Sequence, residues 1–114
     1  MEIRKIKEQE MPEALDLTWR TFLEFEAPDY TEEGIKEFKK SIDDKEWIAA
    51  RDFWGAFEEE KLLGLIATKN YNHIALFFVD GIYHKQGIGR KLFDKICELN
   101  TTGSFITICP EYSA

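Results

Sequence analysis

Hydrophobic residues in the first half of the chain recur mainly at helical spacing. After an extended segment at residues 3–7, Pro12 suits the first turn of a helix. Apolar positions then lie three or four residues apart, which predicts a helix over 12–25. Thr31 is a candidate N-cap for a second helix that ends near residue 43. The apolar positions of the first helix are Ala14, Leu15, Trp19, Phe22 and Leu23.

After residue 50 the apolar spacing changes from helical to extended. Three consecutive glutamates predict a charged hairpin turn between the first two strands of this half. Gly64, within the second strand, predicts a bulge or a close approach of another backbone segment. The predicted elements are strands over 53–57, 62–68, 73–79 and 104–109, and a helix over 87–99.

The predicted elements follow one another in the order β-α-α-β-β-β-α-β. Hairpins combined with one strand-helix-strand crossover imply a mixed, mainly antiparallel sheet with helices packed on it. The fold class is therefore α+β. At 114 residues, with no internal repeat or linker, the chain is predicted to be a single domain over residues 1–114.

Charge is distributed unevenly along the chain. Residues 1–60 hold 18 acidic and 9 basic side chains, whereas residues 61–114 hold 4 acidic and 6 basic ones. An anion is therefore expected to favour the second half, and a cationic partner such as an amine the first. The alternative is that the acidic helices only keep the protein in solution. The net charge of −7 argues against a nucleic-acid partner.

The remaining composition indicates an ordinary cytoplasmic protein. No segment reaches the roughly 18 apolar residues of a membrane span, and the N-terminus lacks the apolar core of a signal peptide. Cys97 and Cys109 have no metal-ligand spacing, and no metal site is predicted. We expect both cysteines to be buried as small hydrophobic residues, with a disulfide between them as the alternative.

A short glycine turn joins the apolar strand at 73–79 to the helix at 87–99. Gly87 and Gly89 mark the start of that helix, and cationic residues flank them. Backbone N–H groups converge at such a helix N-terminus and form a site for an anion. The alternative is that the glycines only make a tight turn. No Walker A loop is present, and position 92 lacks the third glycine of a dinucleotide-binding fingerprint.

The strand, turn and helix together resemble the GNAT superfamily of acyl-CoA-dependent N-acetyltransferases. That family has a strand ending in a hydrophobic-valine-acidic run, followed by [Gln/Arg]-x-x-Gly-x-[Gly/Ala]. Here the strand ends Leu76-Phe77-Phe78-Val79-Asp80, and the motif reads His84-Lys85-Gln86-Gly87-Ile88-Gly89. His84 replaces the usual Gln or Arg and keeps a side chain that can donate a hydrogen bond. The predicted order of elements also fits the family's first five strands and three helices.

The resemblance implies that acetyl-CoA is the co-substrate and that an amine, on a small molecule or a peptide, accepts the acetyl group. Backbone groups at the end of the strand would pair with the pantetheine arm. The thioester would lie near a splay between this strand and the last one. The implied cofactor-binding residues are Phe78, Val79, His84, Lys85, Gln86, Gly87, Ile88, Gly89 and Arg90.

The resemblance also implies direct attack of the amine on the thioester carbonyl. A backbone N–H of the central strand, from Phe78 or Val79, would stabilise the oxyanion. Some members of the family carry a carboxylate base fourteen residues before the first motif glycine. His73 occupies that position here, and an imidazole can accept a proton near neutral pH. The alternative is that His73 only begins the strand.

Members of the family normally continue with a further helix and two strands, which we do not find after residue 109. We therefore expect a C-terminally truncated GNAT fold whose exposed fifth strand is covered by a second copy in a homodimer. An alternative function is a catalytically impaired acyl-CoA-binding or regulatory module. A third is an interaction domain in which the glycine turn is structural.

Overall fold

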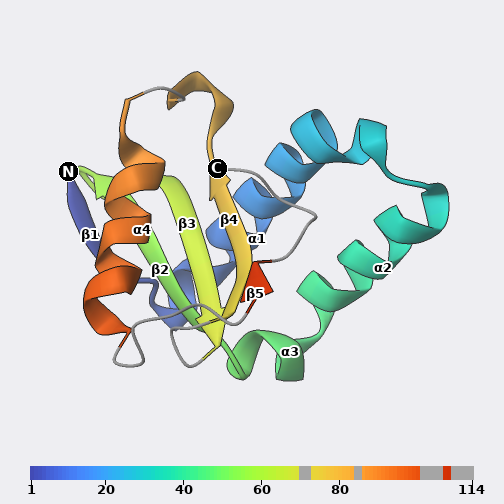
Figure 1. Cartoon of the computed structure of the whole chain (residues 1–114), viewed down its shortest axis with the longest axis horizontal. Coiled ribbons are helices and arrows are strands. Elements are labelled where there is room, and N and C mark those ends of the chain that lie inside the picture. The colour runs from blue at the N-terminus through green and yellow to red at the C-terminus, as the bar shows by residue number, and fades with distance from the viewer. Residues whose placement is uncertain (70–72, 84–85, 101–106, 109–114) are drawn as a thin grey trace.

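A five-stranded sheet forms the centre of the molecule. The structure is a computed structural model, and it describes residues 1–69, 73–83, 86–100 and the backbone of 107–108. The sheet order follows the sequence order, with four antiparallel strands and a fifth that is parallel to the fourth. The predicted mixed, mainly antiparallel sheet is thus confirmed (Figure 1). The strands are β1 (Glu2–Lys5), β2 (Asp52–Glu58), β3 (Lys61–Lys69), β4 (His73–Val79) and β5 (Thr107–Ile108).

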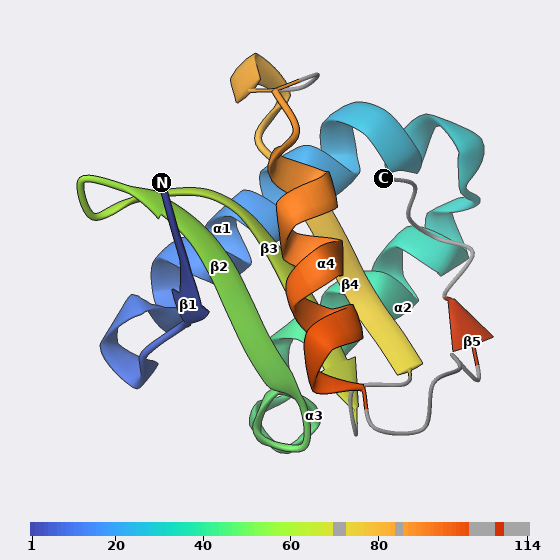
Figure 2. The same cartoon turned by 60° about the vertical axis from the view of Figure 1, so that its left-hand side comes forward.

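Helices cover both faces of the sheet, and β4 contacts both layers. Successive side chains of a strand point to opposite faces. Phe78 accordingly packs edge-on against Phe38 of the second helix, at 6.2 Å between ring centroids, whereas Phe77 stacks with Phe93 of the last helix at 6.5 Å. Figure 2 shows that last helix lying over one face of the sheet. The α-helices are α1 (Met11–Thr21), α2 (Glu32–Asp43), α3 (Lys45–Ala49) and α4 (Ile88–Leu99).

Two local sequence signals act as predicted. The Gly34 N–H donates to Thr31 Oγ1 at 3.0 Å, so Thr31 is the N-cap of α2. Gly64 lies both at a bulge and at a close approach. Leu63 is the extra residue in the β2–β3 ladder, and a Cβ on Gly64 would lie 3.0 Å from the Phe78 carbonyl oxygen.

The connection between α1 and α2 differs from the predicted helix over 12–25. The α-helix ends at Thr21, and the chain continues as a π-helical turn, η2 (Phe22–Glu26), and a 3-10 turn, η3 (Ala27–Asp29). The wider turn leaves Phe22 fully buried while Leu23 and Phe25 remain exposed. Two further 3-10 turns are η1 (Glu8–Glu10) and η4 (Gly81–Tyr83).

The short helix α3 was not predicted. Its N-cap, Asp44, accepts hydrogen bonds from the backbone N–H groups of Glu46, at 2.9 Å, and Trp47, at 3.3 Å. Five residues are too few for a periodic apolar pattern, so the sequence carries only this capping signal. The helix places Trp47 beside α2, where both helices line one pocket.

The expectation for Cys97 was wrong. Its thiol is free and the residue is exposed, because the buried side of α4 follows Ile88, Leu92 and Ile96 at four-residue intervals. Cys97 lies one position further round the helix. Cys109 falls outside the described residues.

The first strand is shorter than predicted because side chains redirect the chain after Lys5. The Lys7 N–H donates to Glu10 Oε1 at 2.9 Å, and this bond starts the turn η1. The same carboxylate pairs with Arg4 through two hydrogen bonds of 2.8 Å. These contacts fasten the beginning of α1 to β1.

We expect Glu10→Gln to lower the thermal midpoint at neutral pH by an amount that shrinks in acid. The hydrogen bonds from Arg4 and from the Lys7 backbone lower the pKa of Glu10 from 4.5 to about 2. The stabilisation is therefore complete above the unfolded value and is lost as pH falls from about 4.5 towards 2. Thermal unfolding of both proteins across this range measures the difference. Glu8→Gln is the matched control, and an equal effect of the two substitutions contradicts the assignment.

Candidate functional site

Asp80 holds the turn that follows β4. Its N–H extends the sheet by donating to the Leu63 carbonyl at 2.9 Å, and its own carbonyl accepts from the Tyr83 N–H at 2.9 Å. The Oδ1 atom accepts from the Ile82 N–H at 3.3 Å, while Oδ2 lies 3.6 Å from the Arg20 guanidinium of α1. Four contacts around one residue thus fix η4 relative to the sheet and to α1.

The N-terminus of α4 lies just beyond this turn, and among the described residues no side chain caps it. Gly87 is the N-cap, with φ 77° and ψ 9°, and its carbonyl accepts from the Lys91 N–H at 3.1 Å. No acidic residue is found in the first turn, where Arg90 is exposed. The N–H groups of a first helical turn have no partners within the helix, and the helix dipole makes this end positive. The local field therefore favours an anion.

The β3–β4 register determines which β4 backbone groups point away from β3. Phe78 lies opposite Leu65, and two residues later the Asp80 N–H bonds to the Leu63 carbonyl. Backbone groups of an antiparallel pair alternate between facing the partner and facing away. The N–H and C=O of Phe78 consequently face β3, whereas those of Val79 face the edge on which β5 pairs.

A bulge interrupts β4 near its middle. Ala67 lies opposite Leu76 and Thr68 lies opposite Ile74, so Ala75 is the extra residue. Among the described residues, β5 pairs with β4 only before this bulge, at His73 and Ile74. A bulge bends its strand and is common beside active sites. The described pairing of the two strands thus lies before the bulge, and the splay that the resemblance implies stays a prediction.

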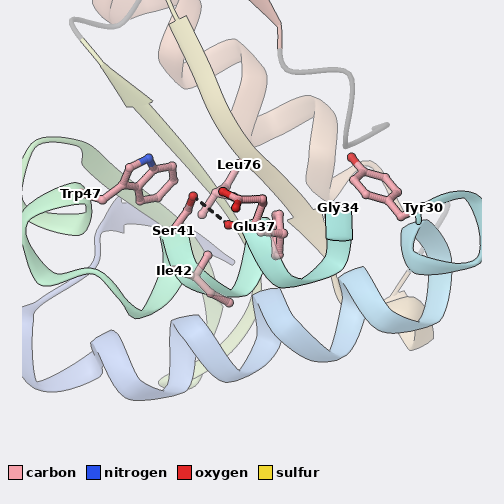
Figure 3. A pocket seen from close by; sticks show the side chains of 8 residues that line it. Tyr30, Gly34, Glu37, Ser41, Ile42, Trp47 and Leu76 are labelled. Carbon is pink, nitrogen blue, oxygen red and sulfur yellow. Dashed lines mark hydrogen bonds between the residues drawn. The ribbon is translucent and has the colours of Figure 1, made fainter. Parts of the chain in front are cut away.

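A pocket opens between α2, α3 and the middle of β4 (Figure 3). Its volume is about 310 Å³, and Leu76 of β4 forms part of its wall. The sequence did not single out this pocket, because its walls come from α2, α3, β4 and Tyr30 before α2, which only the fold brings together. It is lined by Tyr30, Gly34, Glu37, Phe38, Ser41, Ile42, Trp47 and Leu76.

Comparison with known sequences identifies the family. The sequence pattern of the acetyltransferase (GNAT) domain matches residues 26–106, which is more than half of the chain. The chain belongs to the GNAT acetyltransferase domain family. A search among curated proteins finds no match.

Solved structures agree with this GNAT fold. An N-acetyltransferase from Rhodopseudomonas palustris has a TM-score of 0.73 at 20% identity, over 89% of this chain and 66% of its own. PaiA N-acetyltransferase from Thermoplasma acidophilum, solved with coenzyme A, has a TM-score of 0.74 at 21% identity, over 89% and 72%. YjaB from Escherichia coli has a TM-score of 0.69 at 18% identity, over 86% and 65%. The chain thus spans about two thirds of the length of these proteins.

The predicted GNAT motif residues differ in whether the structure describes them and in how exposed their side chains are. His84 and Lys85 lie outside the described residues. Gln86 and Arg90 are exposed at the turn and on the first helical turn. The Ile88 side chain is buried beneath α4, so that residue can serve a ligand only through its backbone.

Gly87 and Gly89 also differ from each other. Gly87 has a positive φ and open space around its missing Cβ, so its requirement for glycine is conformational. A Cβ on Gly89 would meet the rings and methyls of Phe77 and Val79 at 3.6 Å or more, which is ordinary contact distance. The packing therefore leaves room for alanine at position 89.

His73 lies at the start of β4, at the opposite end of the strand from the glycine turn. It is half-buried and stands opposite Lys69 on β3 and Thr107 on β5. Val79 lies six residue positions further along the strand, a span of about 20 Å. Its assignment as a base stays a prediction.

Within the described part of the chain, no cluster of three or more His, Cys, Asp or Glu is placed to hold a metal ion. The described helices are also too short or too polar to cross a membrane.

We expect Gly87→Ala to destabilise this GNAT chain by about 1 kcal/mol, because an alanine at φ 77° is strained. Gly89→Ala is expected to be neutral or to stabilise the chain by up to roughly 1 kcal/mol, because alanine is the better helix former. Urea unfolding of the three proteins gives the free energies of unfolding. Equal losses in the two variants would show that the turn has another geometry.

Proposed function

We propose that the chain binds acetyl-CoA and transfers its acetyl group to an amine. The observation that carries the proposal is the N-terminus of α4, whose N-cap is Gly87 and which no described side chain caps. The diphosphate of the co-substrate is the anion that fits this positive end. The coenzyme A complex of the Thermoplasma relative supports the same ligand.

The pantetheine arm is placed along the edge of β4 that carries β5. Of the two backbone positions predicted from the sequence, Val79 is the better candidate, because the backbone groups of Phe78 face β3. Val79 and Ala75 are about 13 Å apart along the strand. An arm that runs from Val79 over this distance brings the thioester to the bulge at Ala75. The edge after that bulge is where the acetyl group would be accessible to an acceptor.

The proposed reaction is direct transfer. An ammonium group first loses one proton to a base or to water, and the neutral nitrogen attacks the thioester carbonyl. The C–N bond forms and the C–S bond breaks, and the second proton of the attacking nitrogen reaches the leaving thiolate. A backbone N–H on β4 would stabilise the oxyanion in between, and of the two predicted donors only that of Val79 faces away from β3. The acidic first half of the chain favours the approach of a cationic acceptor.

We expect Arg90→Glu to weaken acetyl-CoA binding at least about tenfold, because a carboxylate in the first turn of α4 repels the diphosphate. Isothermal titration of the full chain with acetyl-CoA measures the affinity. Lys36→Glu makes the same change in net charge on α2 and is the control.

Three outcomes of these titrations are informative. Unchanged affinity in Arg90→Glu, or equal losses in both variants, would remove the assigned site. A wild-type chain that does not bind acetyl-CoA would favour the interaction-domain alternative. Tight binding without acetyl transfer to any of a panel of amines would favour a catalytically impaired acyl-CoA-binding module.

A second measurement tests His73. If it is the general base, His73→Gln lowers kcat by roughly 100-fold while acetyl-CoA affinity is unchanged. If it only begins β4, kcat stays at the wild-type value. Release of the coenzyme A thiol at saturating amine reports kcat, and titration with acetyl-CoA reports the affinity.

The homodimer expected from an exposed fifth strand stays a prediction. β5 is described at Thr107–Ile108 alone, where it pairs in parallel with β4.

A further inference from the structure

The pocket between α2, α3 and β4 has aromatic and aliphatic walls. Phe38 and Ile42 are buried beneath it, and Leu76 reaches it from the sheet. Tyr30 and Trp47, both half-buried, stand at opposite ends of the pocket in Figure 3. The volume of about 310 Å³ is at the lower end of small-molecule sites. Walls of this kind fit one small apolar group of a ligand.

Both aromatic ends of the pocket are held in place by neighbours. The Arg51 guanidinium stacks over the Trp47 ring at 3.9 Å and donates to the Trp47 carbonyl at 2.9 Å. The Tyr30 ring packs edge-on against Phe22, at 5.0 Å between centroids. A Cβ on Gly34 would lie 3.1 Å from the Tyr30 ring, so the ring also rests against that glycine. Fixed aromatic walls lower the entropy that a ligand loses on binding.

One acidic side chain faces this apolar space. Of the eight described residues that line the pocket, Glu37 alone carries a formal charge, and Figure 3 shows its side chain between Trp47 and Tyr30. Across residues 1–69, 73–83 and 86–100, no ion pair of Glu37 is found, whereas nearby Lys39 pairs with Asp43 at 2.8 Å. The carboxylate is therefore available to a cation from solution.

A hydroxyl stands one helical turn from this carboxylate. The Ser41 Oγ–H donates to the Glu37 carbonyl at 3.2 Å, which leaves the lone pairs of Oγ able to accept. Residues four apart share one face of a helix. Glu37 and Ser41 thus offer oxygen acceptors side by side to a group that has several N–H donors.

We propose that the acetyl acceptor is a primary amine with a compact aromatic or branched aliphatic body, whose ammonium binds Glu37 and Ser41. This inference deepens the proposed function and rests on it for the reaction. Leu76 adjoins the bulge residue Ala75, so the pocket lies beside the part of β4 to which the thioester is assigned. Glu37 is a binding residue here, and the proton that the ammonium loses before attack passes to a separate base or to water.

We expect 2-phenylethylamine to shift the amide resonances of Glu37 and Ser41 and the indole N–H of Trp47 when it is titrated into the full, ¹⁵N-labelled chain. In Glu37→Gln its dissociation constant should rise roughly tenfold, because a hydrogen-bonded ion pair is lost. 2-Phenylethanol lacks the ammonium, so its affinity should be weaker and the same in both proteins.

The control is Glu33→Gln, which removes an exposed carboxylate one turn earlier on the same helix and outside the pocket. This variant should bind the amine as the wild type does. Equal weakening in the two variants, or shifts confined to other parts of the chain, would overturn the inference.

The same titrations separate this inference from the proposed function. A chain that binds the amine at this pocket but does not bind acetyl-CoA would contradict the proposed function and leave the pocket assignment intact. A chain that binds acetyl-CoA while the amine causes no shifts at Glu37, Ser41 or Trp47 would contradict the pocket assignment alone.

Discussion

The close approach of β3 to the end of β4 is the constraint on which the site depends. Gly64 has no Cβ, and one placed there would lie 3.0 Å from the Phe78 carbonyl oxygen and 3.2 Å from Val79 Cα. A larger residue would push the backbone of β4 away at the point where the strand ends. Because Asp80 bonds to Leu63 immediately beyond this contact, the position of the turn η4 follows from it.

β4 connects two regions with opposite electrostatic preferences. Beyond its end, the first turn of α4 presents N–H groups and Arg90, and no acid caps them. Beside its middle, α2 presents the Glu37 carboxylate above an apolar floor. A reaction between an anionic carrier and a cationic acceptor needs such a separation, because each partner is then attracted to its own part of the site. In the proposed reaction, the strand between them would set the distance between the two ligands.

Elements with a long periodic pattern or a clear capping residue could be predicted from the sequence. This holds for β4, for α4 and for α2 with its cap at Thr31. The helix α3 was too short for a period to emerge, and the π-helical turn after Thr21 keeps the apolar composition of a regular helix. Cys97 looked like a core residue because cysteine is usually buried, yet its angular position on α4 turns it outward.

The residues of the candidate site also divide into those that the sequence predicts and those that only the fold brings together. A glycine turn between a strand and a helix is contiguous in sequence, so the residues around Gly87 could be found by pattern alone. The pocket joins residues from Tyr30 to Leu76, and neither Glu37 nor Trp47 stands out among the many acids and aromatics of the chain. Even within this contiguous segment, the sequence could not decide whether Phe78 or Val79 has backbone groups that face away from β3. That choice needs the register, because a shift of one residue along β4 reverses which backbone groups face β3. The pairing with Leu65 and the bond from Asp80 to Leu63 therefore turn the backbone groups of Val79 away from β3, which no motif could show.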